Sequence, residues 1–271
     1  MPLNTHSSPG AGAGSTHRFG YEWGHYSEMR PLYETQFRRW TPFMAPEDWA
    51  GKTFIDVGCG MGRNSYWPMT YGAAGGLAID LDENSLASAR RNLAGFPTLA
   101  VERCSAYELD GRSSYDIAFS IGVIHHVEDP DLALANMVRS VKPGGLVMIW
   151  VYGLENNRWI VHGFSPLRRL LFSRLPIGVT HALSVVPAAL LWLALRLGLS
   201  RIEYFRLIRQ FDFAHLRSIV FDQMLPEIAH YWSREEVEAL MRRAGLADVE
   251  LSWVNEMSWA AKGRRPVGGP G

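Results

Sequence analysis

The sequence predicts an α/β fold built on a mostly parallel sheet, and three observations support this prediction. An apolar strand over 54–57 runs directly into a turn with glycine at every second position, 58, 60 and 62. Strand-like and helix-like patterns then alternate as far as residue 151. The chain of 271 residues is long enough for one such domain with a substantial core and an additional helical part.

The glycine turn indicates a ligand site. Glycine allows positive φ angles and lets a ligand approach with no Cβ in the way, and the following helix directs free N–H groups at the turn. The spacing from Asp56 to Gly62 differs from the Gly-x-Gly-x-x-Gly of dinucleotide-binding proteins. A second strand over 76–80 ends in Asp80, which can accept hydrogen bonds from ribose hydroxyls. We therefore expect a polar cofactor that contains a ribose.

The remaining elements follow in order from the same patterns. We expect helices over 83–93, 132–141 and 233–243, and strands over 99–103, 146–151, 249–254 and 258–261. Lys142-Pro143-Gly144-Gly145 ends the second of these helices. Ser233 and Glu236 form a capping box for the last helix, and Gly245 ends it.

Four segments in this order resemble the class I S-adenosylmethionine-dependent methyltransferases. They are Asp56-Val57-Gly58-Cys59-Gly60-Met61-Gly62, Ala78-Ile79-Asp80-Leu81-Asp82, Tyr115-Asp116-Ile117-Ala118-Phe119-Ser120 with Val123-Ile124-His125-His126-Val127, and Lys142-Pro143-Gly144-Gly145-Leu146. The resemblance covers residues of roughly 50 to 152. It implies a Rossmann-like seven-stranded sheet with one antiparallel strand, helices on both faces, and S-adenosylmethionine as the cofactor.

The resemblance also implies the cofactor-binding residues. In that family the glycine loop wraps the methionine part of the cofactor, the acid after the second strand holds the ribose, and the loop after the third strand contacts adenine. At Ser105 the chain departs from the pattern, because many relatives have Asp there, and we expect backbone groups to take over this contact. The implied cofactor-binding residues are Asp56, Gly58, Gly60, Gly62, Asp80, Leu81, Ser105, Ala106 and Ser120.

Two neighbouring histidines are the candidate catalytic residues. His125 and His126 follow the fourth strand at the edge where open α/β sheets bind ligands, and one of them can deprotonate an acceptor. Adjacent side chains often point apart, so we expect at most one in the pocket, favour His125, and keep open that either is simply packed. No metal site is expected, because neighbouring histidines lack the spacing of a helical ligand pair. Further polar candidates are Tyr21, Tyr152, Asn156, Asn157, His230, Tyr231, Asn255 and Glu256.

The chain divides into four expected parts. Residues 1–18 form a disordered lead-in with no signal-peptide pattern, and 19–50 form an aromatic helical cap in which two glycines favour a mobile lid over 19–26. The methyltransferase domain covers 51–152 and 232–265. A helical, partly apolar insertion over 153–231 precedes the last two strands and forms the acceptor site or a lid.

The insertion contains an apolar segment without Asp, Glu, Lys or Arg, 175–195, flanked by five arginines at 168, 169, 174, 196 and 201. Prolines and polar residues interrupt it, which disfavours a spanning helix of ~20 apolar residues. A buried lid or a dimer helix is the favoured interpretation. A surface that meets a membrane or a lipid-linked substrate stays open, because basic flanks suit anionic headgroups.

Composition excludes several functions. Lys plus Arg and Asp plus Glu are both 27, so no excess of positive charge favours nucleic acid. Only Cys59 and Cys104 are present, which fits a reducing, cytoplasmic compartment. The leading hypothesis is methyl transfer from S-adenosylmethionine to an oxygen, nitrogen or carbon of a small-molecule or lipid-linked acceptor. The alternatives are an oxidoreductase, whose Tyr-x-x-x-Lys pair we do not find, and a non-catalytic cofactor-binding protein that engages a partner or membrane through 175–195.

Overall fold

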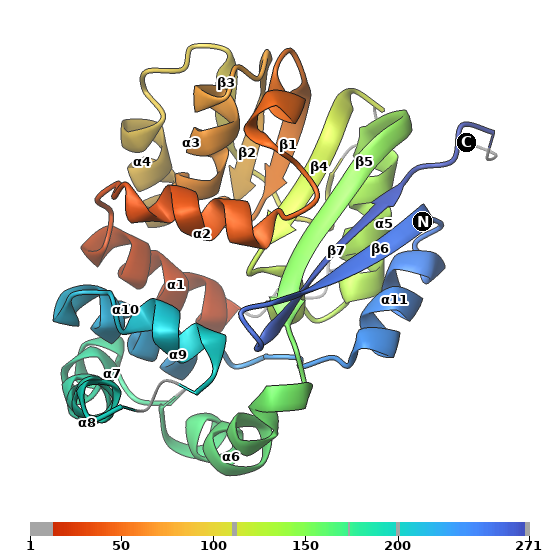
Figure 1. Ribbon diagram of the computed structural model, residues 1–271. Helices are drawn as coiled ribbons and strands as arrows, with labels where there is room; N and C mark the ends of the chain where they lie inside the picture. Colours follow the sequence, from red (N-terminus) through yellow and green to blue (C-terminus); the bar gives the residue numbers. More distant parts are fainter. Residues whose placement is uncertain (1–12, 110–112, 173, 199–200, 269–271) are drawn as a thin grey trace, which may run out of the picture.

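A seven-stranded sheet forms the centre of the computed structural model, which describes residues 13–109, 113–172, 174–198 and 201–268 (Figure 1). The strand order is β3-β2-β1-β4-β5-β7-β6. Strands β1 to β5 pair in parallel, and β7 is antiparallel to both of its neighbours. The predicted α/β fold class is therefore confirmed. The strands are β1 (Thr53–Val57), β2 (Gly75–Asp80), β3 (Leu99–Arg103), β4 (Tyr115–Ile121), β5 (Val141–Tyr152), β6 (Ala247–Val254) and β7 (Ser258–Arg264).

Helices cover both faces of the sheet because its central strands are apolar on both sides. Phe54 and Phe119 point to one face, where they pack with Phe37 and Trp49, whereas the neighbouring Ile55 belongs to the core of the other face. The first face carries α2 (Leu32–Trp40), α3 (Arg63–Thr70) and α4 (Glu83–Asn92), with the short turn η1 (Pro46–Trp49). The second carries α5 (Pro130–Ser140) and α11 (Arg234–Arg243).

The structure differs from the sequence prediction at the start of β5. Lys142-Pro143-Gly144-Gly145 was expected to separate a helix from a strand, but it is the first part of β5. Val141 pairs with Tyr115, and the register shifts before Ile117 pairs with Leu146. Backbone hydrogen bonds from Gly144 to Arg265 (2.8 Å) and from Arg265 to Gly145 (2.9 Å) hold this segment in the sheet. The predicted capping box of α11 is confirmed at Ser233.

The N-terminal part also differs from the prediction. Residues 1–12 of the expected lead-in lie outside the described residues, but 13–18 form the beginning of helix α1 (Ala13–His25). Arg18 explains this order, because its guanidinium donates hydrogen bonds to the carbonyls of Phe172 (2.6 Å) and Leu175 (3.0 Å) in the insertion. The segment 19–26, expected as a mobile lid, lies almost entirely within the same helix.

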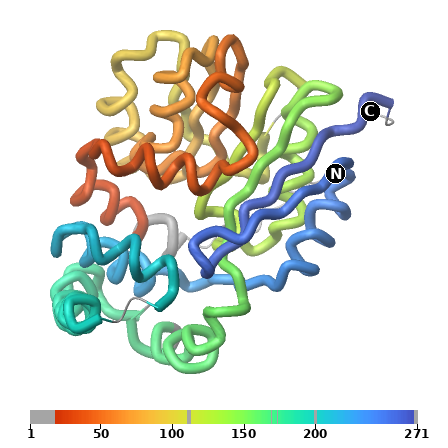
Figure 2. Tube along the Cα trace, viewed as in Figure 1, coloured from red at the N-terminus to blue at the C-terminus, as the bar shows by residue number. Residues whose placement is uncertain are grey.

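The insertion and α1 together build a helical cap beyond the carboxyl ends of the parallel strands (Figures 1 and 2). Helix α1 packs against α10, so an element from the beginning of the chain joins elements from its second half. The short turn η2 (Ile124–His126) follows β4. The part of the cap that the insertion supplies follows β5 and consists of η3 (Glu155–Asn157), η4 (Ile160–Phe164), α6 (Ser165–Leu167), η5 (Arg168–Phe172), α7 (Ile177–Leu183), α8 (Val185–Arg196), α9 (Glu203–Ile208) and α10 (Phe213–Met224).

The apolar segment of the insertion is mostly on the surface, not in the core. Within α8 only Ala188 and Leu195 are buried, whereas Val186 and Leu190 are 57% and 65% exposed. By length and composition alone, Ile177–Arg196 is apolar enough to cross a membrane, and 17% of it is buried inside the structure. The interpretation of this segment as a buried lid is therefore not supported, and its exposed face needs another partner.

Helix α1 docks on α4 through a glycine. A Cβ at Gly20 would lie 1.9 Å from Oδ1 of Asp82, the residue that caps α4. Ser88 of α4 also donates a hydrogen bond to the carbonyl of Trp23 (3.2 Å). Any side chain at position 20 thus separates the two helices or displaces the cap of α4.

We predict that Gly20→Leu loosens α1. Amide hydrogen exchange in residues 18–25 should become at least about tenfold faster, because the contact with α4 that protects the helix is lost. Gly24→Leu, in the same helix and with nothing within 4 Å of its Cβ position, is the matched control and should exchange like the wild type. Equal exchange in the two variants would contradict the packing through Gly20.

Candidate active site

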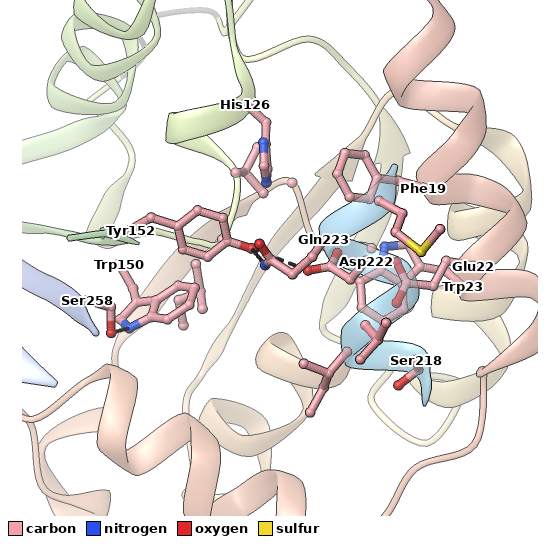
Figure 3. Close-up of a pocket in the computed structure, with 18 of the residues that line it drawn as sticks. Phe19, Glu22, Trp23, His126, Trp150, Tyr152, Ser218, Asp222, Gln223 and Ser258 are labelled. Carbon is pink, nitrogen blue, oxygen red and sulfur yellow. Dashed lines mark hydrogen bonds between the residues drawn. The ribbon is translucent and has the colours of Figure 1, made fainter. Parts of the chain in front are cut away.

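A cavity of about 1000 Å³ lies between the carboxyl edge of the sheet and the helical cap. Small-molecule pockets have volumes of roughly 300–1000 Å³, so this one has room for a cofactor and a second molecule. Its walls come from the glycine turn, α1, β5 and the insertion. Figure 3 shows side chains from α1, β5 and the insertion around the cavity.

The glycine turn forms one end of the cavity and depends on the missing side chains. Gly58 and Gly60 have φ angles of +81° and +53° and line the cavity. A Cβ at Gly58 would lie 2.4 Å from Val123, and one at Gly60 would lie 3.1 Å from Nε1 of Trp23. Gly62 (φ +83°) starts α3 and packs against Leu93, behind the wall of the cavity. The turn is thus a bare backbone surface enclosed by Trp23.

Asp80 lies at this end of the cavity as well. Its carboxylate accepts hydrogen bonds from the backbone N–H groups of Gly60 (2.9 Å) and Asp82 (3.1 Å), and burial raises its pKa. The neighbouring Asp82, not Asp80, caps α4 by accepting from Ser85 N–H (2.9 Å). Asp80 therefore does not cap this helix. Leu81, Ser105 and Ala106 line the cavity beside it.

Three of the predicted cofactor-binding residues support the turn from behind. Asp56 is fully buried, and its Oδ2 accepts a hydrogen bond from the hydroxyl of Ser65 (2.6 Å). Among the described residues, its Oδ1 has no partner, and burial raises its pKa to about 7. Ser120 is also buried and donates to the carbonyl of Val57 (2.7 Å). With Gly62, these residues lie behind the cavity wall in the described structure, and their role in cofactor binding stays a prediction.

The two histidines are placed differently. His125 is fully buried, stacks on Tyr152 with ring centroids 3.9 Å apart, and lies outside the cavity wall; burial holds its pKa well below the usual value. His126 lines the cavity, and its Nδ1 lies 2.8 Å from the carbonyl oxygen of Ile228, which leaves Nε2 as the acceptor nitrogen. Burial lowers the pKa of His126 to about 4. Of the pair, His126 and not the favoured His125 faces the cavity, and it is a weak base.

Two acidic side chains that the sequence analysis did not select meet in the cavity. Glu22 of α1 is 2% exposed, and Asp222 comes from α10. Their carboxyl groups lie close enough to share a hydrogen bond, and burial raises the pKa of both, that of Glu22 most. The other oxygen of Glu22, Oε2, has no partner among the described residues. No local pattern marks these residues, because their chemistry depends on a contact between the two ends of the chain.

Polar and cationic groups surround this carboxyl pair. Tyr152 donates to Oδ2 of Asp222 (3.3 Å) and accepts a hydrogen bond from the Gln223 amide (2.7 Å), as Figure 3 shows. The guanidinium carbon of Arg63 lies 5.0 to 5.3 Å from the ring centroids of three aromatic residues, Trp23, Tyr33 and Trp40. Its positive charge lowers the pKa of both carboxyl groups and opposes the effect of burial.

The residues at the glycine end fit the cofactor that the sequence analysis expects. They offer a backbone surface without Cβ atoms for close approach and a carboxylate after β2 for a ribose. Among the described residues, no group of three or more His, Cys, Asp or Glu side chains is arranged to hold a metal ion.

Sequence comparison supports the same assignment. Residues 55–149 match the family model described as a methyltransferase domain. The ubiquinone biosynthesis O-methyltransferase of Thiobacillus denitrificans is 35% identical over 141 residues, which are 50% of this chain and 58% of that relative. The chain thus matches little more than half the length of this curated relative.

Solved structures show the same fold. A S-adenosylmethionine-dependent methyltransferase of Thermotoga maritima, described as a possible histamine N-methyltransferase, has a TM-score of 0.54 at 16% identity and covers 93% of this chain and 99% of its own. Human N-acetylserotonin methyltransferase in complex with S-adenosylmethionine has a TM-score of 0.55 at 13% identity and covers 93% and 56%. Residues 55–149 therefore form a methyltransferase domain, and the chain has the fold of the class I S-adenosylmethionine-dependent methyltransferases.

Proposed function

We propose that this protein methylates an oxygen atom of an apolar, lipid-linked acceptor in the cytoplasm, at the surface of a membrane. The observation that carries this proposal is the continuity of the cavity. It begins at Gly60 and Asp80 and continues to Val186, Leu190 and Leu167, which are exposed on the outside of the cap. An acceptor with a long apolar tail can therefore place its reacting end near the cofactor while the tail lies along the insertion.

The residues of this chain bind and orient the cofactor and the acceptor, and they exclude water from the site. When bound, S-adenosylmethionine supplies a methyl group on a positively charged sulfur, and its transfer needs alignment and a dry site more than any further chemistry. Trp23 covers the glycine turn, and the carboxylate of Asp80 lines the cavity, where it can accept hydrogen bonds from a ribose. Other parts of the wall are apolar, with Trp150, Ile160, Phe164, Phe172 and Leu191 among the lining residues.

The oxygen acceptor is supported by the named relative, an O-methyltransferase of ubiquinone biosynthesis. The match extends over only 58% of that relative. We therefore base the proposed acceptor on two observations together, the name of this relative and the apolar lining of the cavity. Cytoplasmic location is consistent with the two cysteines, Cys59 and Cys104, because neither forms a disulfide in the structure.

The exposed face of α7 and α8 supports the membrane contact. Val179, Leu183, Val186, Leu190 and Leu193 are between 42% and 65% exposed, and burying such side chains in lipid is worth about 1.5–3 kcal/mol each. The flanking charge is smaller than the sequence suggests, because Arg168 is fully buried. Arg174, Arg196 and Arg201 are exposed and are the flanking groups that can meet anionic headgroups.

Calorimetric titration with S-adenosylmethionine, S-adenosylhomocysteine and NAD tests the cofactor. We expect micromolar binding of the first two and none of NAD. Binding without turnover of any acceptor would support the alternative of a non-catalytic cofactor-binding protein, whereas binding of NAD alone would contradict the proposed function.

We predict that Asp80→Asn weakens S-adenosylmethionine binding by about tenfold or more. The variant loses charge-assisted hydrogen bonds to the ribose, each worth about 1.5–3 kcal/mol. Calorimetry measures the affinity, and thermal unfolding checks that the Gly60 turn is intact. Asp131→Asn, a surface carboxylate paired with Arg243 on the far side of the domain, is the matched control and should bind like the wild type. Unchanged affinity in Asp80→Asn would remove the ribose assignment.

We also predict that Val186→Glu with Leu190→Glu reduces binding to anionic phospholipid vesicles by at least about a hundredfold. Two apolar side chains lose their transfer free energy, and about 1.4 kcal/mol corresponds to a factor of ten. Vesicle co-sedimentation measures the effect. Leu132→Glu is the control, because Leu132 is 42% exposed but lies on α5, away from the cap.

Two results would contradict the membrane proposal. One is that the wild-type protein stays in solution with anionic vesicles. The other is a stable dimer in light scattering that the double substitution converts to a monomer, since α8 would then be a dimer helix.

A further inference from the structure

We propose that the Glu22–Asp222 carboxyl pair is the proton-accepting site for the acceptor's hydroxyl group, with Asp222 as the catalytic residue and Glu22 as its positioning partner. This inference rests on the proposed function and adds the class of acceptor group. Of the predicted histidines, His125 lies outside the cavity wall, and burial lowers the pKa of His126, whereas burial raises the pKa of both carboxyl groups.

The position of the pair fits this role. Glu22 precedes Trp23, the residue that encloses Gly60 at the cofactor end, and Asp222 lines the cavity on the acceptor side. Figure 3 shows Asp222 at the end of the hydrogen bonds from Gln223 through Tyr152, and Glu22 interacts with the same carboxyl group. The pair therefore lies where the cofactor end and the acceptor end of the cavity meet.

The hydrogen bonding leaves the pair incomplete without a ligand. Glu22 is 2% exposed, lines the cavity, and its Oε2 has no partner among the described residues. A buried oxygen of this kind is costly unless a donor reaches it. A donor group of a molecule bound in the cavity would fill this place, so the pair is a site that a ligand completes.

Charge balance favours a hydroxyl over an amine. Two adjacent buried carboxyl groups share one proton and carry one negative charge, which the positive charge of Arg63 offsets. The pair can thus take one more proton and become neutral. An amine at the same place would be held as an ammonium ion, whose lone pair is occupied, so the site would bind it without reaction.

The proposed step is balanced in atoms and charge. The hydroxyl oxygen forms the new bond to the methyl carbon, the carbon–sulfur bond breaks with its electron pair on sulfur, and the hydroxyl proton passes to the carboxylate of Asp222. Glu22 donates the shared hydrogen bond that holds Asp222 in place, and Tyr152 does the same from the other side.

The test uses 4-nitrophenol, whose ionised form is coloured, bound to the full-length protein saturated with S-adenosylhomocysteine. At a pH where the free probe is mostly neutral, the wild type should show the phenolate band on binding. Asp222→Asn should lose at least about nine tenths of this band, and Glu22→Gln, which keeps a hydrogen-bond donor, should retain most of it. The surface variant Asp131→Asn is the control and should behave like the wild type.

A second measurement needs no variant. Infrared difference spectra of the wild type should show a gain in protonated carboxyl absorption as the phenolate forms, because the proton moves to the pair. Bound probe that stays neutral, a failure to bind it, or an unchanged phenolate band in Asp222→Asn overturns the inference. If S-adenosylhomocysteine still binds in those cases, the proposed methyltransferase function survives, whereas loss of cofactor binding would refute that function itself.

The shared proton also predicts a pH dependence of stability. Burial raises the pKa of Glu22 above its ordinary value, so its contribution to stability is complete below that value and is lost as the pH rises through the folded-state pKa. Glu22→Gln should therefore gain stability relative to the wild type in urea unfolding as the pH rises above the ordinary pKa of Glu, about 4.3. A constant difference would show that Glu22 is not the protonated partner. The charged or titratable groups that act on the pair are Arg63, Tyr26, Tyr152, Arg168, Tyr204 and Tyr231.

Discussion

The hydrogen bond from the Gly60 N–H to the Asp80 carboxylate is the interaction on which the rest of the site depends. It joins the turn after β1 to the end of β2, and it forms only because Gly58, Gly60 and Gly62 all adopt positive φ angles. The same lack of side chains lets Trp23 approach the turn. One backbone geometry therefore shapes the cofactor end of the cavity and determines how closely α1 can cover it.

Covering the turn with α1 connects distant parts of the sequence. Arg18 holds the beginning of α1 to the insertion through the carbonyls of Phe172 and Leu175. Gly20 has no side chain, which allows α1 to pack closely against α4. As a result Glu22 reaches Asp222 on α10. The cavity is thus assembled from the N-terminal helix, the sheet edge and the insertion, and none of these three parts encloses it alone.

The sequence predicted the sheet and the cofactor end well because their signals are local. Alternating or continuous apolar residues mark the strands, and the glycine turn with Asp80 needs only short-range spacing. The carboxyl pair has no such signal, since Glu22 and Asp222 meet only through tertiary packing. Likewise, the apolar composition of 175–195 is the same for a core helix and a surface helix, and only the structure shows that α8 buries Ala188 and Leu195 but leaves Val186 and Leu190 exposed. The helical structure of residues 13–18 could not be predicted for the same reason, because Arg18 holds it through contacts with Phe172 and Leu175, which are far away in the sequence.

The cap combines buried charged side chains with exposed apolar ones. Glu22 and Arg168 are buried inside it, whereas Leu190 and Leu197 of the α8 region point outward with 65% and 80% exposure. Burying charge and exposing leucine are both unfavourable in water, so this arrangement makes sense when a ligand and a surface complete it. A lipid-linked acceptor does both, because its polar end meets the buried charges while its tail and the surrounding membrane cover the exposed leucines.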